Sequence, residues 1–173
     1  ASGSLPPGVP LNIYAQLAKI ANRKNAKFIV DTSGEPLERA VEEGVYLLKP
    51  NLGELSSLAD KKELQPGGIK DIARGIIAKG KCEVMVISMG AAGAMMVTND
   101  MAEIFTTPPL IRKSTVGAGD SMVAGIIFYL SQGKDLAEAG FYLCPVCGNI
   151  EFGAPPDTCP ICGTRKEKFV GVA

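Results

Sequence analysis

The stretch 114–130, STVGAGDSMVAGIIFYL, places a glycine turn directly before a strongly apolar helix. Glycines let several backbone N–H groups point at one spot, and the start of a helix adds positive potential there. Such a spot suits a phosphate, and Asp120 at the same place could accept a proton from a hydroxyl group. The same residues also fit an ordinary glycine turn in which Asp120 caps the helix.

Upstream of this helix, buried strands alternate with amphipathic helices. The patterns predict helices that begin at Pro10, Gly34 and Ile69, the last two ending at Gly44 and near Gly80. They predict strands at 27–31, 45–51 and 83–88, and an antiparallel pair, 93–98 and 102–107, around the Asn99–Asp100 turn. This alternation predicts an α/β fold with a mostly parallel sheet covered by helices.

Polar residues follow two of the predicted strands. In KPNLGEL, Lys49, Asn51 and Glu54 come just after a strand end, where α/β sheets carry ligand groups. An Asn and a Glu there could hold a hydrated Mg²⁺, and they equally fit a helix-capping Asn with solvated charges. In SMGAAGAM, Gly90 and Gly93 allow close approach to a nucleotide or form an ordinary strand–turn–strand.

Together and in this order, SGSLPPG, KPNLGEL, SMGAAG and TVGAGDSMVAG resemble the ribokinase-like (PfkB) sugar kinases. Within that family the similarity is greatest to the ATP-dependent 6-phosphofructokinases and related hexose-phosphate kinases. The resemblance covers residues 2–139. It implies a partial ribokinase-like, Rossmann-like fold whose ligands are ATP, Mg²⁺ and a sugar phosphate of the fructose 6-phosphate kind.

The resemblance also implies roles for individual residues. For phosphoryl transfer, it implies that Asp120 is the catalytic base. It also implies that the backbone N–H groups of Gly117, Ala118 and Gly119 form an anion hole. For the nucleotide and its metal, it implies Mg²⁺ and phosphate contacts from Asn51, Glu54 and Lys49, and a nucleotide-side loop with Ser88, Gly90 and Gly93. For the sugar phosphate, it implies a contact from Ser4.

The family's members are much longer than this chain. Most of their sugar-binding groups, their β-sheet lid and the segment that helps to enclose the adenine have no counterpart here. Catalysis by positioning needs both substrates fixed and water excluded, so we expect impaired kinase activity. The missing strands also leave a sheet edge to be covered, for instance by a second copy in a homo-oligomer.

Four of the five cysteines form two near-identical knuckles, Cys144-Pro-Val-Cys147-Gly and Cys159-Pro-Ile-Cys162-Gly. Two facing knuckles give a tetrahedral site with four sulfur ligands, whereas the alternatives are disulfides or inert thiols. A tail of this size buries little core of its own, so a metal would supply folding energy. Cys82 lies apart, at the entry to a strand, and we expect a packed thiol.

Residues 141–170 resemble the rubredoxin-like tail of rubrerythrins, with Tyr142, Phe152 and Phe169 as aromatic packing. The resemblance implies a single iron that cycles between Fe²⁺ and Fe³⁺ for one-electron transfer, and zinc satisfies the same geometry. In rubrerythrins the tail passes electrons to a di-iron domain. A chain without His cannot build that domain, so the resemblance implies an electron partner outside this chain.

Composition narrows the function classes. Lys+Arg and Asp+Glu both number 18, so no basic field favours nucleic acid or an acidic membrane. The absence of His excludes a His-based triad and a His-ligated metal. Paired cysteines, no long apolar run and no signal segment favour a cytoplasmic protein without membrane contact. The start at Ala1 without Met indicates a processed, excised or engineered beginning.

The sequence therefore predicts a chimera, with a kinase fragment at 1–138 and a rubredoxin-like metal-knuckle domain at 139–173. Three function classes remain open. The chain is an electron-transfer module carrying a passenger fragment, a sugar-phosphate kinase that needs a partner for its missing half, or an engineered or remnant metal-binding protein without enzymatic activity.

Overall fold

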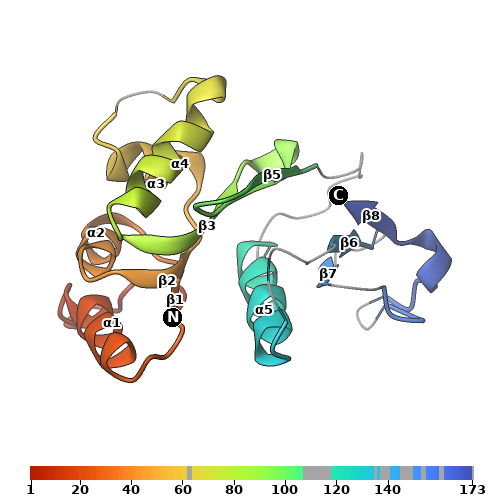
Figure 1. Ribbon diagram of the computed structural model, residues 1–173. Helices are drawn as coiled ribbons and strands as arrows, with labels where there is room; N and C mark the ends of the chain where they lie inside the picture. The colour runs from red at the N-terminus through yellow and green to blue at the C-terminus, as the bar shows by residue number, and fades with distance from the viewer. Residues whose placement is uncertain are drawn as a thin grey trace. The chain divides into compact units, whose positions relative to one another are not determined.

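The chain folds into two compact units (Figure 1). The computed structural model describes residues 1–61, 64–106, 118–134, 136, 141–144, 150–152, 155–159 and 162–172. The first unit comprises Ala1–Gly90 and Ala94–Glu103, and the second takes in Ala91–Gly93 and the described residues from Ile104 onwards. The predicted domain boundary between residues 138 and 139 lies outside the described residues, so it stays a prediction.

The first sheet has five strands in the order β1-β2-β3-β4-β5. β1 pairs with β2 and β2 with β3 in parallel, whereas β3 and β4 are antiparallel. The first three strands are therefore parallel to one another, in line with the mostly parallel sheet that the sequence predicted. Its strands are β1 (Ile29–Val30), β2 (Val45–Leu48), β3 (Cys82–Ser88), β4 (Ala94–Val97) and β5 (Ala102–Phe105).

Figure 1 shows four helices gathered beside β1, β2 and β3. Gly44 and Gly80 follow two of them with φ of 75° and 72°, the left-handed conformation that commonly ends a helix. Both helix ends were predicted at these glycines, whereas the short helix α3 was not predicted. The four helices are α1 (Ile13–Arg23), α2 (Gly34–Glu42), α3 (Leu52–Leu58) and α4 (Ile69–Ala78), with a 3₁₀ turn η1 (Pro66–Gly68) before α4.

The hydrophobic core lies between these helices and the sheet. Val30, Leu48 and Met85 on the three parallel strands are fully buried. They belong to one cluster with residues of all four helices, among them Leu37 and Ile77. Burial at successive positions of β2, β3 and β4 is typical of a sheet covered on both faces.

The second unit contains α5 (Ala118–Ser131) and a three-stranded antiparallel sheet in the order β7-β6-β8. The apolar helix was predicted at 120–130, whereas the sheet was not. On α5, Val123, Ile126 and Tyr129 are buried, while Phe128 is 62% exposed. The strands are β6 (Phe141–Leu143), β7 (Ile150–Phe152) and β8 (Val170–Val172), and this unit contains the 3₁₀ turn η4 (Lys166–Lys168). A further 3₁₀ turn, η2 (Gly90–Ala92), begins at the last residue before the chain enters this unit.

Among the described residues, no helix is both long enough and apolar enough to cross a bilayer.

Gly93, between η2 and β4, is confined by a backbone contact. Its φ is 96°, a conformation that residues with a Cβ rarely adopt. A Cβ built on Gly93 would lie 1.8 Å from the carbonyl oxygen of Phe105. The glycine is therefore required by the close approach of two backbone segments of the second unit.

We expect Gly93→Ala to destabilise the protein by about 1–3 kcal/mol or more, because it adds strain at positive φ and a collision with backbone. Gly75→Ala, in the interior of α4 with nothing within 4 Å of the added Cβ, is the matched control. It should stabilise by about 0.5–1 kcal/mol through helix propensity. Urea denaturation followed by circular dichroism measures both changes, and equal effects would contradict this account.

Candidate functional site

The polar residues of the first unit meet at the carboxyl ends of its parallel strands. The chain just after β1 pairs with the N-terminal segment, through a parallel bridge between Ser2 and Asp31. The chain just after β2 pairs with the end of β3, through a bridge between Asn51 and Ser88. Pairing thus continues beyond the strands and places these residues along one edge, where open α/β sheets bind ligands.

A buried ion pair lies at this edge. Lys49, which follows β2, places its Nζ 3.2 Å from Oδ1 of Asp31, which follows β1, and the two side chains are only 7% and 17% exposed. The register of the parallel strands, Val30 opposite Leu48, brings the two residues together. Sequence reasoning selected Lys49 and missed Asp31, although an acid directly after a buried strand was the available signal.

The SGSLPPG segment is held by hydrogen bonds at Gly3. The Gly3 carbonyl accepts from the Thr32 hydroxyl at 2.9 Å and from the Tyr14 hydroxyl at 3.0 Å. The Gly3 N–H donates to the Asp31 carbonyl at 2.9 Å. Ser4, the predicted sugar-phosphate contact, is exposed immediately after this anchored glycine.

Asn51 and Glu54 form a reciprocal capping box at the start of α3. Asn51 Oδ1 accepts from the Glu54 N–H at 2.9 Å, and Glu54 Oε2 accepts from the Asn51 N–H at 2.8 Å. This is the helix-capping alternative that the sequence left open, and it uses one oxygen of each side chain. Asn51 is exposed and Glu54 half-buried, so the cap still leaves both residues at the surface.

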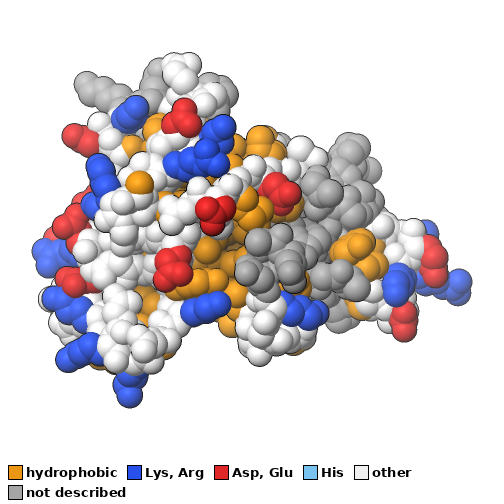
Figure 2. Space-filling model, viewed as in Figure 1, with side chains coloured by type: hydrophobic (Ala, Val, Ile, Leu, Met, Phe, Trp, Pro, Cys, Tyr) orange, Lys and Arg blue, Asp and Glu red, His pale blue; other side chains and the backbone are white. Residues whose placement is uncertain are grey.

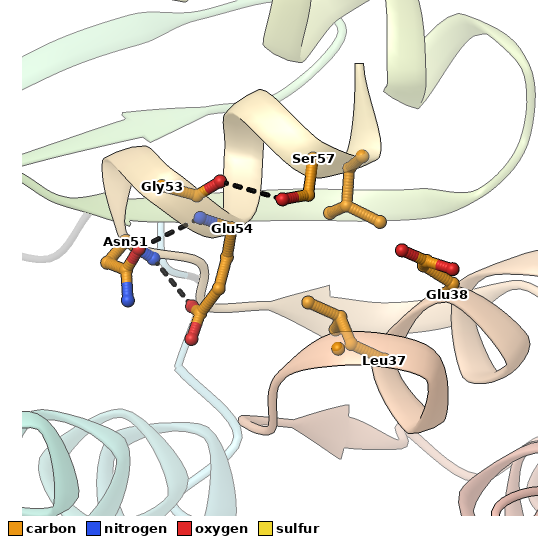
Figure 3. Close-up of a pocket in the computed structure, with 8 residues that line it drawn as sticks. Leu37, Glu38, Asn51, Gly53, Glu54 and Ser57 are labelled. Carbon is orange, nitrogen blue, oxygen red and sulfur yellow. Dashed lines mark hydrogen bonds between the residues drawn. The ribbon is translucent and has the colours of Figure 1, made fainter. Parts of the chain in front are cut away.

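A pocket of about 260 Å³ opens between α2 and α3, and Figure 3 shows its walls. The carboxylate of Glu54 bends back toward Asn51 from one side, and Leu37 and Glu38 of α2 line the other. The pocket has two acidic side chains and one amide among its walls, a set that favours a cation over an anion. The Ser57 hydroxyl donates to the Gly53 carbonyl at 3.2 Å in the same wall, and Gly34 and Leu58 complete the lining.

The remaining predicted kinase residues are divided between the units. Ser88, half-buried, ends β3, and its N–H donates at 2.9 Å to the carbonyl of Pro50 in the segment after β2. Gly90, with φ of 61°, begins η2. Ala118, Gly119 and Asp120 form the first turn of α5, where Asp120 is exposed and favourably placed for the helix dipole. Gly117 lies outside the described residues.

Three of the four knuckle cysteines converge in the second unit. The sulfur atoms of Cys144, Cys159 and Cys162 all lie within 4.8 Å of one another, with Cys144 and Cys162 at 3.5 Å. A tetrahedral site with metal–sulfur bonds of about 2.3 Å has sulfur–sulfur separations of about 3.8 Å. The three thiols therefore fit a single metal ion, and Cys147, the fourth predicted ligand, lies outside the described residues.

The backbone of the second knuckle is tied back on itself. The Cys159 N–H donates to the Thr164 carbonyl at 2.7 Å, and the Gly163 N–H donates to the Cys159 carbonyl at 2.9 Å. Gly163 has φ of 72°, as this tight turn requires. Cys144 and Cys159 are buried, whereas Cys162 is exposed, so one ligand of the cluster faces solvent.

Cys82, at the start of β3, is separate from this cluster. It is 3% exposed, and burial raises the pKa of its thiol to about 12, with a smaller contribution from the Glu83 carboxylate. A buried thiol with such a pKa is protonated at neutral pH, so it is a poor nucleophile. The expectation of a packed thiol is confirmed.

Comparisons with known proteins agree with both halves of this picture. Residues 1–142 match the family described as pfkB family carbohydrate kinase, and residues 142–170 match the rubredoxin-like domain of rubrerythrin. The chain is 41% identical over 138 residues to the ATP-dependent 6-phosphofructokinase isozyme 2 of Escherichia coli, covering 79% of this chain and 45% of that protein. It is 38% identical over 136 residues to the 1-phosphofructokinase of Rhodobacter capsulatus, covering 79% of this chain and 43% of that protein.

Solved structures show the same relation. The phosphofructokinase-2 of Escherichia coli in complex with fructose-6-phosphate superposes with a TM-score of 0.71 at 39% identity, covering 79% of this chain and 45% of that one. A phosphofructokinase from Staphylococcus aureus gives a TM-score of 0.71 at 28% identity, covering 79% and 44%. The chain spans less than half the length of the curated relatives it matches.

The two residues of the buried ion pair at the sheet edge should show a large coupling energy in the free energy of unfolding. In a double-mutant cycle of Asp31→Asn and Lys49→Met, we expect a coupling energy of about 1–3 kcal/mol, because removing one partner leaves a buried charge uncompensated. The matched control is the pair Glu42–Lys81, whose atoms are 3.0 Å apart but whose side chains are 68% and 33% exposed. That cycle should give about 0.2–1 kcal/mol. Urea denaturation measures both, and equal couplings would show that the pair is not effectively buried.

Proposed function

Because the chain belongs to the pfkB family of carbohydrate kinases, we propose that residues 1–138 are the phosphoryl-transfer half of an ATP-dependent sugar-phosphate kinase. The same chain carries a rubredoxin-like domain, which we propose spans 139–173 and holds one metal in a four-cysteine site. The observation that carries the metal site is the convergence of three sulfur atoms within 4.8 Å. The observation that carries the kinase half is the family match over residues 1–142.

In the kinase half, we assign proton removal from the acceptor hydroxyl to Asp120. Its place in the first turn of α5 supports this role, since a helix start also concentrates backbone N–H groups. Those of Gly117, Ala118 and Gly119 would stabilise the charge on the transferred phosphoryl group. Ser4 would contact the sugar phosphate, because it is exposed beside the anchored Gly3.

For the nucleotide side, we assign Asn51 and Glu54 to Mg²⁺ and the phosphates. The acidic pocket beside α3 supports this, because Mg²⁺ keeps several waters and needs few protein ligands. Lys49 would approach the phosphates from its place beside Asp31. Ser88, Gly90 and Gly93 would belong to the nucleotide-side loop. ATP would be the phosphoryl donor.

The 173-residue chain by itself should be a poor kinase. It spans less than half the length of its relatives, and positioning both substrates while excluding water needs groups from the remainder. One structure of the Escherichia coli relative is described as a tetrameric inhibited form. We propose that copies of this chain also associate, and that this association covers exposed sheet edges.

We expect no turnover of fructose 6-phosphate within the usual enzyme range of about 1–10³ per second, but weak saturable binding of MgATP. Asp120→Asn should tighten ATP binding roughly threefold, because it removes a negative charge beside the phosphates. The matched control is Asp71→Asn, which changes an exposed aspartate in the first turn of α4. Calorimetric titration measures all three proteins. Rapid turnover, or no saturation at millimolar ATP, would contradict the proposal.

In the metal domain, Cys144, Cys147, Cys159 and Cys162 would hold the ion. Iron in such a site would supply a one-electron Fe²⁺/Fe³⁺ couple, whereas zinc would supply only folding energy. The thiols of Cys144 and Cys159 are buried, and Cys162 faces solvent, where a redox partner can approach. Paired cysteines of this kind are suited to the reducing cytoplasm, which we propose as the compartment.

Elemental analysis of the folded protein should find one iron or zinc per chain. Cys144→Ser should lower metal affinity at least about tenfold and unfold the small sheet, because a hydroxyl is a poor ligand and metal binding supplies folding energy. Cys82→Ala is the control, since it removes an equally buried cysteine without touching the cluster, and should keep the full metal content. Folded wild-type protein without metal would refute the site.

A further inference from the structure

Thr164 lies against Cys162, which is the exposed member of the three described cysteines of the cluster. Its Oγ1 is 3.0 Å from the sulfur of Cys162. A metal-bound thiolate has no proton, so in this contact the hydroxyl must donate and the sulfur accept. We propose that the Thr164 hydroxyl bonds to the Cys162 thiolate and raises the reduction potential of an iron in this site. The inference rests on the proposed metal function.

The hydroxyl is held in place by the backbone around it. The Thr164 carbonyl accepts from the Cys159 N–H at 2.7 Å, so Thr164 is tied to another ligand of the same cluster. On either side, Gly163 donates to the Cys159 carbonyl, and Arg165 forms an antiparallel bridge with Thr158. The donor therefore meets the sulfur without further ordering of the chain, as an effective second layer around a metal requires.

The direction of the effect follows from charge. Reduction adds one electron to the site and takes up no proton, so the sulfur ligands carry more negative charge in the ferrous state. A hydrogen bond to a sulfur is then stronger in the ferrous state than in the ferric state, and it shifts the couple to higher potential.

The test compares the full-length, iron-loaded protein with two variants by protein-film voltammetry. Thr164→Val keeps the branched shape and removes the hydroxyl, so the potential should fall. We expect the preference for ferrous over ferric iron to drop about three- to tenfold, the range of one hydrogen bond, which is at most about 59 mV. Thr164→Ser restores a hydroxyl and should return the potential toward the wild-type value.

Two further variants make the result decisive. Thr158→Val makes the same change at an exposed threonine next to Cys159 and should leave the potential unchanged. Thr164→Ala removes the hydroxyl without adding bulk and replaces Thr164→Val should that variant not hold iron.

Three outcomes would overturn the inference. Equal potentials in the wild type, Thr164→Val and Thr164→Ala show that the hydroxyl does not act on the couple. A potential of Thr164→Ser as low as that of Thr164→Val shows that packing, not the hydrogen bond, sets the value. Failure of the wild type itself to bind iron overturns the proposed redox function, and the inference with it, and is distinguished by iron content before any voltammetry.

Discussion

The parallel hydrogen-bond ladder of β1, β2 and β3 constrains everything else in the first unit. The side chains of these strands are buried at nearly every position, so the strands themselves offer little surface to a ligand. Apart from Tyr46 in β2 and Glu83 and Ser88 in β3, the polar side chains lie in the residues that follow each strand. The ladder's register then decides which of these residues meet, and it places Asp31 beside Lys49 and Asn51 beside Ser88.

The two units are stabilised in different ways. The first unit buries a continuous apolar cluster that joins four helices and the sheet. The small sheet of the second unit has strands of three residues each, tied to a knuckle whose sulfur atoms converge. Hydrophobic burial stabilises the first, whereas the proposed metal would supply much of the folding free energy of the second. The chain therefore combines an extended apolar core with a small sheet that has little core of its own.

Most of the first unit was predictable because its signals are periodic and local. Helical spacing predicted α1, α2 and α4, and glycines at positive φ predicted where two of them end. The helix α3 was missed because seven residues are too few to show a period, although the spacing of Asn51 and Glu54 is that of a capping box. The strands β6, β7 and β8 were missed for the same reason. The pairing of Asp31 with Lys49 depends on strand register, and the contact of Thr164 with Cys162 on a turn, neither of which composition reveals.

Burial of Cys82 has a consequence for where a solute meets sulfur. Of the five cysteines in the chain, Cys82 is packed at the start of β3, and burial keeps its thiol protonated. Cys162, in contrast, is exposed. In the folded chain, an ion or an oxidant in solution therefore meets sulfur at Cys162 and not at Cys82.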